Sequence, residues 1–501
     1  MDSRQDLKGK ILKGSIVLTI RQLLTAGLSL VSLLVIARIL GPDQYGIVTS
    51  ALGIFYFIIW TGRLGLNTYL VRQPELPKDG LAQVVAFYNT VGVGLCILLW
   101  LATPLAGWWT REPRVTLALQ WLIPVVWLDM VSLAAIGMLE RELRFAEVGL
   151  IEGIAKVTNY AFSIPWVLMV DPSRGYLGPI LGTAVEFTIK TILTYYFRPI
   201  SWQFRWRWSF LKPALVYGLT YSGSDLILNL RTLRVPILVS RFVGMEAVGI
   251  TNMAIRLVEQ LSLLRLVMRR MSISVIAKLI HEPNATRNAI SKGMAYQALM
   301  IGPICAGFAV CASWIIPLVF DEKWLLSAQI FPLIALGTLV SAVFDLHTAT
   351  LYAAGHNREV AKVNISYVSV LWVTCLGLIW LIQAWRPGYG IWSYGISEII
   401  ALPCFFLIHR SFSKFCGAPD YRLAFWLVIA ALPPLLGSPL LQPLLTHWGL
   451  NGIQYTLWYL SIGLFLFIAS YGLVFTMNGT LRQLSLELWQ TWRSRKQKQP
   501  S

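Results

Sequence analysis

Arginines recur inside an apolar stretch of this chain, where charged side chains are costly to place. The stretch LKPALVYGLTYSGSDLILNLRTLRVPILVSRFVG, residues 211–244, carries Arg231, Arg234 and Arg241. On a regular helix these three side chains fall within an arc of about 80°. A guanidinium offers paired donors that match phosphate oxygens, and the attraction strengthens where water is scarce. We therefore predict that Arg231 and Arg234 hold a phosphate-bearing ligand.

Three further basic residues inside apolar stretches are candidates for the same contact. Arg21 joins the two arginines above, and Arg63 and Arg256 are weaker candidates. A basic side chain at the middle of a bilayer costs roughly 2.5–3.5 kcal/mol on insertion scales, so such residues normally face a cavity or a partner. The alternative for Arg256 is a structural salt bridge with Glu259, three positions further on.

Acidic residues also occur inside apolar stretches. Asp225 and Glu398 are candidates to titrate or to coordinate an ion, and the alternative for each is a structural partnership with a nearby polar group. Glu152 and Lys156 have the i, i+4 spacing of a helical salt bridge. The six cysteines are scattered without metal or redox spacing, and the sequence has no nucleotide-binding loop, so no cofactor or metal is predicted.

The elements that must position these residues are membrane-spanning helices. Of the 501 residues, 56% are hydrophobic and only 13% are charged, and the mean hydropathy is +0.62. Runs of about 20 apolar residues, enough to cross a hydrocarbon core of about 30 Å as a helix, recur along the chain. We predict an all-α polytopic membrane protein with fourteen spans, at 14–40, 45–70, 81–106, 115–138, 146–170, 177–197, 212–242, 246–268, 292–319, 329–354, 360–384, 389–409, 422–445 and 452–477.

The basic residues outside the spans are distributed unevenly between the two sides. With the N-terminus placed in the cytoplasm, the cytoplasmic segments hold 28 Lys and Arg, and the opposite side holds seven when the helix-end residues Arg38 and Arg241 are included. This bias is the positive-inside rule, and it predicts that both termini are cytoplasmic. The net charge of +18 therefore indicates orientation and contact with anionic lipid, and no nucleic-acid partner is expected.

A glycine motif occurs twice, 203 positions apart. Residues 37–47 read ARILGPDQYGI and residues 240–250 read SRFVGMEAVGI. Each motif alone is typical of a helix end followed by a turn. The copies lie six predicted spans apart, so both run through the membrane in the same direction and indicate a parallel repeat. We expect two pseudo-symmetric six-helix lobes around a central cleft, with two additional helices after them.

This repeat divides the chain into four predicted parts. The parts are an N-terminal lobe (1–200), a C-terminal lobe (201–415), two additional transmembrane helices (416–477) and a basic cytoplasmic tail (478–501).

Three stretches of the sequence carry a family resemblance. They are LLVIARILGPDQYGIVTSALGIF around the first glycine motif, LERELRF at 139–145, and IIPLVFDEKWLLSAQIFPLIAL at 315–336. Together they resemble the polysaccharide-transporter branch of the oligosaccharide flippases (Wzx type), in the multidrug/oligosaccharidyl-lipid/polysaccharide exporter superfamily. The resemblance extends from about residue 11 to about residue 410. One departure is Asp321, in FDEKW, where the family pattern has Gly.

The resemblance implies a flippase of the bacterial inner membrane, and not an enzyme. Such a protein moves undecaprenyl-diphosphate-linked oligosaccharide from the cytoplasmic to the periplasmic leaflet by alternating access, for export of O-antigen, capsule or exopolysaccharide. Its partners would be the lipid-linked oligosaccharide, membrane lipids, and a polysaccharide polymerase or other export machinery. Asp225 and Glu398 would then be the candidates for proton or sodium coupling.

Three other functions stay open at this point. A peptidoglycan lipid-precursor flippase shares the fourteen spans and the cationic cleft, and only the motif resemblance disfavours it. A cation-coupled multidrug antiporter should carry acidic groups where this chain has arginines. A membrane glycosyltransferase needs a sizeable extracytoplasmic loop for its catalytic groups, and every loop predicted here is short.

Overall fold

The computed structural model describes most of the chain between residues 2 and 479. The backbone is described for residues 2–72, 79–263, 281–386, 388–447 and 452–479, with residues 265, 276 and 279 as isolated positions. Side chains are described from residue 27 onward in these stretches, apart from residues 68, 72, 220–222, 224, 225, 442–444, 446, 447, 452 and 453.

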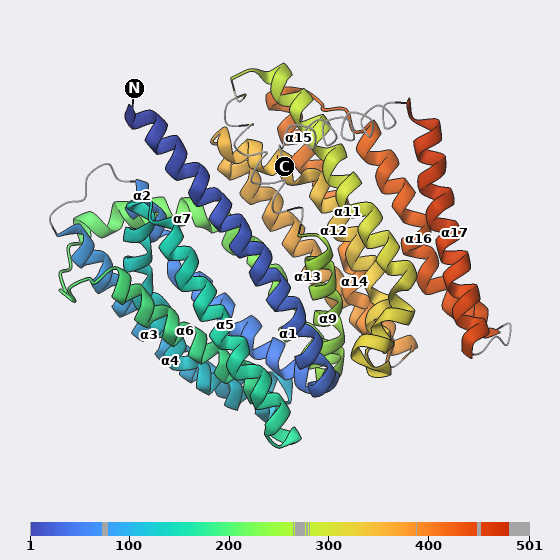
Figure 1. The fold of residues 1–501 in the computed structure, drawn as a ribbon, viewed down its shortest axis with the longest axis horizontal. Helices are drawn as coiled ribbons and strands as arrows, with labels where there is room; N and C mark the ends of the chain where they lie inside the picture. Colours follow the sequence, from blue (N-terminus) through green and yellow to red (C-terminus); the bar gives the residue numbers. More distant parts are fainter. Residues whose placement is uncertain are drawn as a thin grey trace, which may run out of the picture. The chain divides into compact units, whose positions relative to one another are not determined.

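The described residues form helices joined by turns and by irregular segments such as residues 198–207, and no strand occurs among them (Figure 1). The helices are α1 (Asp2–Arg63), α2 (Leu66–Arg72), α3 (Gly80–Thr110), α4 (Pro113–Arg141), α5 (Phe145–Met169), α6 (Leu177–Phe197), α7 (Trp208–Asn229), α8 (Ser240–Phe242), α9 (Met245–Leu261), α11 (Pro283–Phe320), α12 (Leu325–Ala353), α13 (Asn357–Trp385), α14 (Trp392–Ile400), α15 (Phe405–Cys416), α16 (Arg422–His447) and α17 (Gly452–Met477). This confirms the predicted all-α fold.

The predicted spans coincide with these helices. The first lies on α1, which is kinked at Gly41, where φ is 71°, and the second covers the end of α1 and most of α2. The seventh covers α7 and α8, and the twelfth covers α14 and α15. Within the described residues, nine helices are long and apolar enough to cross a membrane, counting the described part of α1 as one. The shorter or more polar spans α5, α6, α7 and α9 are not among the nine.

The contacts divide the chain into two compact units. The first consists of Met1–Asn252 with Cys375–Ile391, and the second of Met253–Thr374 with Trp392–Ser501. In the first unit α4 packs against α3, α6 and α1, and in the second α12 packs against α11, α16 and α14. These two helices, the fourth and tenth predicted spans, are the most buried of the nine candidates. The predicted lobe boundaries at residues 200 and 415 stay a prediction.

The seventh span is not a regular helix. The α-helix α7 ends at Asn229, a 3₁₀ turn follows at Leu230–Leu233, and a π turn at Val235–Val239 leads into α8. Pro236 lies at the start of the π turn, and proline cannot donate the backbone hydrogen bond that a continuous α-helix needs. The regular helix assumed for the 80° arc of Arg231, Arg234 and Arg241, with 100° per residue throughout, is therefore wrong.

The two glycine motifs pack against each other inside the first unit. Gly41 and Gly244 have φ angles of 71° and 119°, so each ends a helix in a conformation that glycine adopts readily. A Cβ at Gly46 would collide with the backbone of Met245, and one at Gly249 would collide with that of Pro42. With the offset of 203 these two contacts are equivalent, so the crossing has the two-fold symmetry that the repeat predicts.

Candidate functional site

A buried carboxylate with two cationic partners lies in the first unit. Asp129 of α4 is fully buried. Its Oδ2 lies 3.1 Å from Nη2 of Arg63, at the end of α1, and its Oδ1 lies 2.8 Å from Nζ of Lys190, on α6. We call these three residues the Asp129 cluster. Two positive charges share one negative charge, so these three residues together carry a net charge of about +1. The carboxyl of Glu140, also on α4, lies near enough to Arg63 to interact with its charge as well.

The surplus charge of the Asp129 cluster is on its exposed member. The Arg63 side chain is 35% exposed, compared with 14% for Lys190. The guanidinium lies over the ring of Trp60, 5.5 Å from its centroid, and the Arg63 carbonyl accepts a hydrogen bond from the Tyr88 hydroxyl. Arg63 is therefore held in place by Asp129 and Trp60 while part of its donor edge stays accessible to a ligand.

A second ion pair in the first unit is electrically balanced. Nζ of Lys156 on α5 lies 3.1 Å from Oε2 of Glu186 on α6. The same carboxylate oxygen accepts a hydrogen bond of 2.6 Å from Nδ2 of Asn159. Because the carboxylate is matched by one cation and one amide, this pair leaves no surplus charge for a ligand. The sequence pairs Lys156 with Glu152 by helical spacing, and it gives no sign of this partner on the next span.

Arg231 and Arg234 lie at the break in the seventh span. Arg231 is in the 3₁₀ turn and is partly buried. Arg234 caps that turn and is fully buried, and its Nε donates a hydrogen bond of 3.2 Å to the Arg231 carbonyl. In a 3₁₀ turn residues three apart are eclipsed, so these two side chains start from the same side of the backbone. In this conformation Arg234 stabilises the 3₁₀ turn through this hydrogen bond, and the side chain of Arg231 is the more accessible of the two.

The structure places the remaining candidate residues as follows. Arg256 and Glu259 on α9 form the predicted salt bridge, at 3.0 Å, and both side chains are more than half exposed. Glu398 on α14, in the second unit, is buried and accepts a hydrogen bond of 3.1 Å from the Tyr367 hydroxyl. The side chains of Arg21 and Asp225 lie outside the described residues.

Comparison with known proteins identifies the family. The family model for polysaccharide biosynthesis proteins matches residues 35–329. The chain is 24% identical over 302 residues to the teichuronic acid biosynthesis protein TuaB of Bacillus subtilis, a match that covers 58% of this chain and 60% of that protein. It is 23% identical over 378 residues to the lipopolysaccharide biosynthesis protein WzxC of Escherichia coli, a match that covers 72% of each.

The fold also has a counterpart among solved structures. The chain is similar to the lipid II flippase MurJ in an inward closed conformation, with a TM-score of 0.67 and 12% sequence identity, over 92% of this chain and 99% of that one. This likeness shows a shared fold. Together with the family match it confirms the resemblance found in the sequence, and the chain belongs to the polysaccharide biosynthesis protein family, as a multi-pass membrane protein.

Proposed function

We propose that this protein is a flippase of the bacterial inner membrane, with both termini in the cytoplasm. It moves undecaprenyl-diphosphate-linked oligosaccharide from the cytoplasmic to the periplasmic leaflet for export of a surface polysaccharide. The family and fold are those of carriers and not of enzymes. The relatives' names connect them to teichuronic acid and lipopolysaccharide biosynthesis, and one solved structure of similar fold is a lipid II flippase.

The observation that carries this proposal is the surplus positive charge of the Asp129 cluster. The lipid chain of the substrate prefers the bilayer, whereas its sugar-diphosphate head needs a polar path. A net positive group at membrane depth is costly unless something anionic meets it during function. Arg63, held by Asp129 but partly exposed, has free donors for diphosphate oxygens.

The other predicted residues complete the proposed path. We assign Arg21, Arg231 and Arg234 to the diphosphate, with Arg256 in a weaker role. Arg234 is buried here, so its part in binding depends on the conformational change of alternating access. Asp225 and Glu398 stay the proposed groups for proton or sodium coupling. A polysaccharide polymerase or other export machinery is the proposed protein partner.

Arg63→Gln tests this assignment with little risk to folding. The substitution leaves Asp129 paired with Lys190 at 2.8 Å, so the cluster becomes neutral and no buried charge is left alone. In a strain that lacks the native gene, this variant should insert normally and export at least about tenfold less polysaccharide, which corresponds to a loss of about 1.4 kcal/mol. The control is Arg174→Gln, which removes an exposed arginine outside the spans. Full export by a normally inserted Arg63→Gln variant would remove Arg63 from the path.

Lipid analysis of the deletion strain separates the alternatives. The proposal expects diphosphate-linked oligosaccharide trapped on the cytoplasmic leaflet of viable cells. A peptidoglycan-precursor flippase would instead leave cells that cannot build their wall, and an antiporter would change drug susceptibility without trapping any glycolipid. A glycosyltransferase would transfer sugar in reconstituted vesicles without net translocation. Any of these three results contradicts the proposal.

A further inference from the structure

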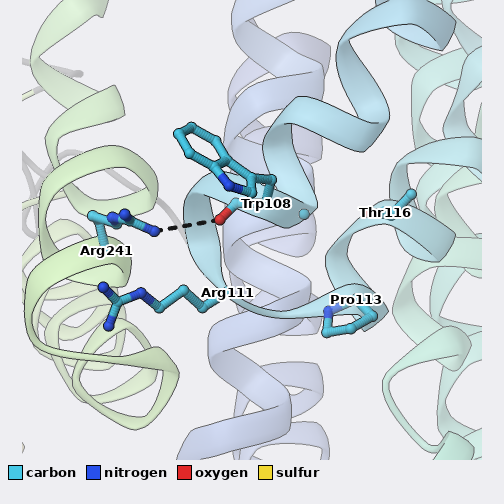
Figure 2. Close-up of a pocket in the computed structure, with 6 residues that line it drawn as sticks. Trp108, Arg111, Pro113, Thr116 and Arg241 are labelled. Atoms are coloured by element: carbon cyan, nitrogen blue, oxygen red, sulfur yellow. Dashed lines mark hydrogen bonds between the residues drawn. The ribbon is translucent and has the colours of Figure 1, made fainter.

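A pocket of about 590 Å³ opens at the turn between α3 and α4, within the first unit. Figure 2 shows its lining, which consists of Gly107, Trp108, Arg111, Pro113, Thr116 and, from α8, Arg241. The charge bias places this turn on the extracytoplasmic side, opposite to the predicted cytoplasmic loops. The pocket is thus separate from the Asp129 cluster, whose residues lie within the predicted spans.

Arg241 is held rigidly at the pocket by aromatic and backbone contacts. Its guanidinium lies 5.4 Å from the ring centroids of both Trp108 and Trp109. Nη1 donates to the carbonyl oxygens of the same two residues, at 3.4 and 3.3 Å. The indole N–H of Trp109 in turn donates to the Ile237 carbonyl at 2.8 Å. A guanidinium fixed in this way loses little conformational entropy when it binds a ligand.

Arg111 contributes the second charge from an unusual backbone position. It follows the last residue of α3 with φ at 57°, in the left-handed region where glycine is usual, and its N–H donates to the Gly107 carbonyl. A non-glycine residue there costs of order 1 kcal/mol. Its side chain is exposed and lines the pocket.

The two pocket arginines have no carboxylate partner among the described residues, whereas their neighbour does. Arg114 lies 2.8 Å from Oε1 of Glu112 and 2.9 Å from Oδ2 of Asp43, so these two carboxylates are engaged with it. Arg111 and Arg241 form no ion pair in the part of the chain that the structure describes. Two like charges at one opening repel each other, and an anion between them lowers the free energy of the pair.

The remaining wall of the pocket suits a sugar. Trp108 is 63% exposed, so much of its indole is accessible beside the two arginines. Aromatic rings present an apolar face next to polar groups, which matches a sugar ring that bears an anionic substituent. Guanidinium groups bind carboxylate and phosphate oxygens with the same paired geometry.

From these contacts we infer that the pocket formed by Arg111, Arg241 and Trp108 is a second binding site, specific for an oxyanion carried on the translocated glycan head. The inference rests on the proposed function, and it adds a contact on the extracytoplasmic side after the head has crossed. The oxyanion is a carboxylate of an acidic sugar or a phosphate of the lipid carrier, since both have the chemistry that two guanidinium groups recognise.

Calorimetric titration of the full-length protein in phosphatidylcholine nanodiscs tests this site. The probes are a disaccharide that contains glucuronic acid, inorganic pyrophosphate, and the matched neutral disaccharide. The wild type should bind at least one of the two anions and not the neutral disaccharide. Binding of the acidic disaccharide identifies an acidic sugar as the source, and binding of pyrophosphate identifies the carrier diphosphate.

Two variants and one control keep the test independent of folding. Arg111→Gly removes the charge and suits the left-handed backbone, so it should fold at least as well and bind about tenfold more weakly. Arg111→Gln with Arg241→Gln should abolish binding, and the control Arg174→Gln should bind like the wild type.

Several results would overturn the site. These are failure of both anions to bind the wild type, equal binding of the neutral disaccharide, or unchanged binding by Arg111→Gly. Loss of all probe binding in nanodiscs that contain phosphatidylglycerol would show that a lipid headgroup occupies the pocket instead. Because soluble probes need no translocation, a protein that binds them but does not flip lipid-linked oligosaccharide contradicts the proposed function and not the site.

Discussion

Asn252 donates a hydrogen bond from Nδ2 to Oγ1 of Thr49 at 3.0 Å, and the two residues stand 203 positions apart. This is the offset of the repeated glycine motif, so each residue contacts its own counterpart in the other copy. A contact between equivalent positions lies on a two-fold axis. The crossing of α1 and α9 is therefore the centre of the pseudo-symmetry within the first unit, with Gly46 and Gly249 on either side of this hydrogen bond.

Alanine at either crossing glycine should destabilise the protein. Gly46→Ala and Gly249→Ala each place a Cβ against a carbonyl of the opposing backbone, which cannot move aside like a side-chain end. We expect a loss of about 1–3 kcal/mol for each, measured as unfolding of the purified protein in detergent. Gly94→Ala on α3 is the control, because no atom lies within 4 Å of its Cβ position. Equal stability of Gly46→Ala and Gly94→Ala would show that the helices do not cross this closely.

Removal of the buried Asp129 carboxylate alone should be more damaging than its removal together with one of its two cationic partners. Asp129→Asn leaves Arg63 and Lys190 facing each other without a counter-ion, and breaking a buried pair in this way costs about 3–5 kcal/mol. The double variant Asp129→Asn with Lys190→Met restores the original net charge and should recover much of that loss. The measurement is a double-mutant cycle on unfolding free energy. Additive losses in that cycle would exclude the cluster as an energetic unit.

Arg231 and Arg234 should differ in what their loss does. Arg231→Ala removes a partly exposed side chain, so it should insert at the normal level and lower export. Arg234→Ala removes a fully buried side chain and its hydrogen bond to the Arg231 carbonyl, so it should destabilise by about 2–4 kcal/mol. Quantitative blotting of the membrane fraction, alongside polysaccharide export, distinguishes the two effects. If both variants showed the same membrane level and the same export, a ligand-binding role for Arg231 and a structural role for Arg234 would be contradicted.

The turn before α4 should loosen in acid. The hydrogen bond from Arg114 lowers the pKa of Glu112 below its ordinary value of 4.5, and the Glu112 side chain also accepts from the Arg114 N–H. A lowered carboxyl pKa gives stability that is present above 4.5 and lost as the pH falls through the lower folded value. Amide exchange around residues 112–116, corrected for the intrinsic rate, should therefore speed up below about pH 4.5. Glu112→Gln should remove this pH dependence, and its persistence in that variant would assign it to another group.

Features that depend on one stretch of sequence could be predicted, and pairings between stretches could not. Span lengths, the Gly41 and Gly244 turns and the offset of 203 follow from local patterns, and the Arg256–Glu259 pair follows from helical spacing. The partners of Asp129 lie 66 and 61 positions away, so no local rule relates them.

Local chemistry explains two further differences, one between the predicted and the observed seventh span and one between this sequence and the family pattern at Asp321. Pro236 signals a break in the seventh span, but the sequence does not show how 3₁₀ and π turns redistribute the arginines. Asp321, where the family pattern has Gly, has φ at 101°, and its Oδ1 accepts a hydrogen bond of 2.6 Å from the Glu322 N–H. The position favours glycine, and the aspartate partly offsets its strain with this bond.

The crossing of the two glycine motifs also means that one packing surface is synthesised well before the surface it contacts. The first motif enters the membrane 203 residues before its counterpart has been synthesised. At about 5–20 residues per second this leaves the glycine surface of α1 without its partner for roughly 10–40 s. During that interval this surface of α1 can form non-native contacts with other helices. The insertion machinery or the intervening spans must therefore cover it until α9 has been inserted.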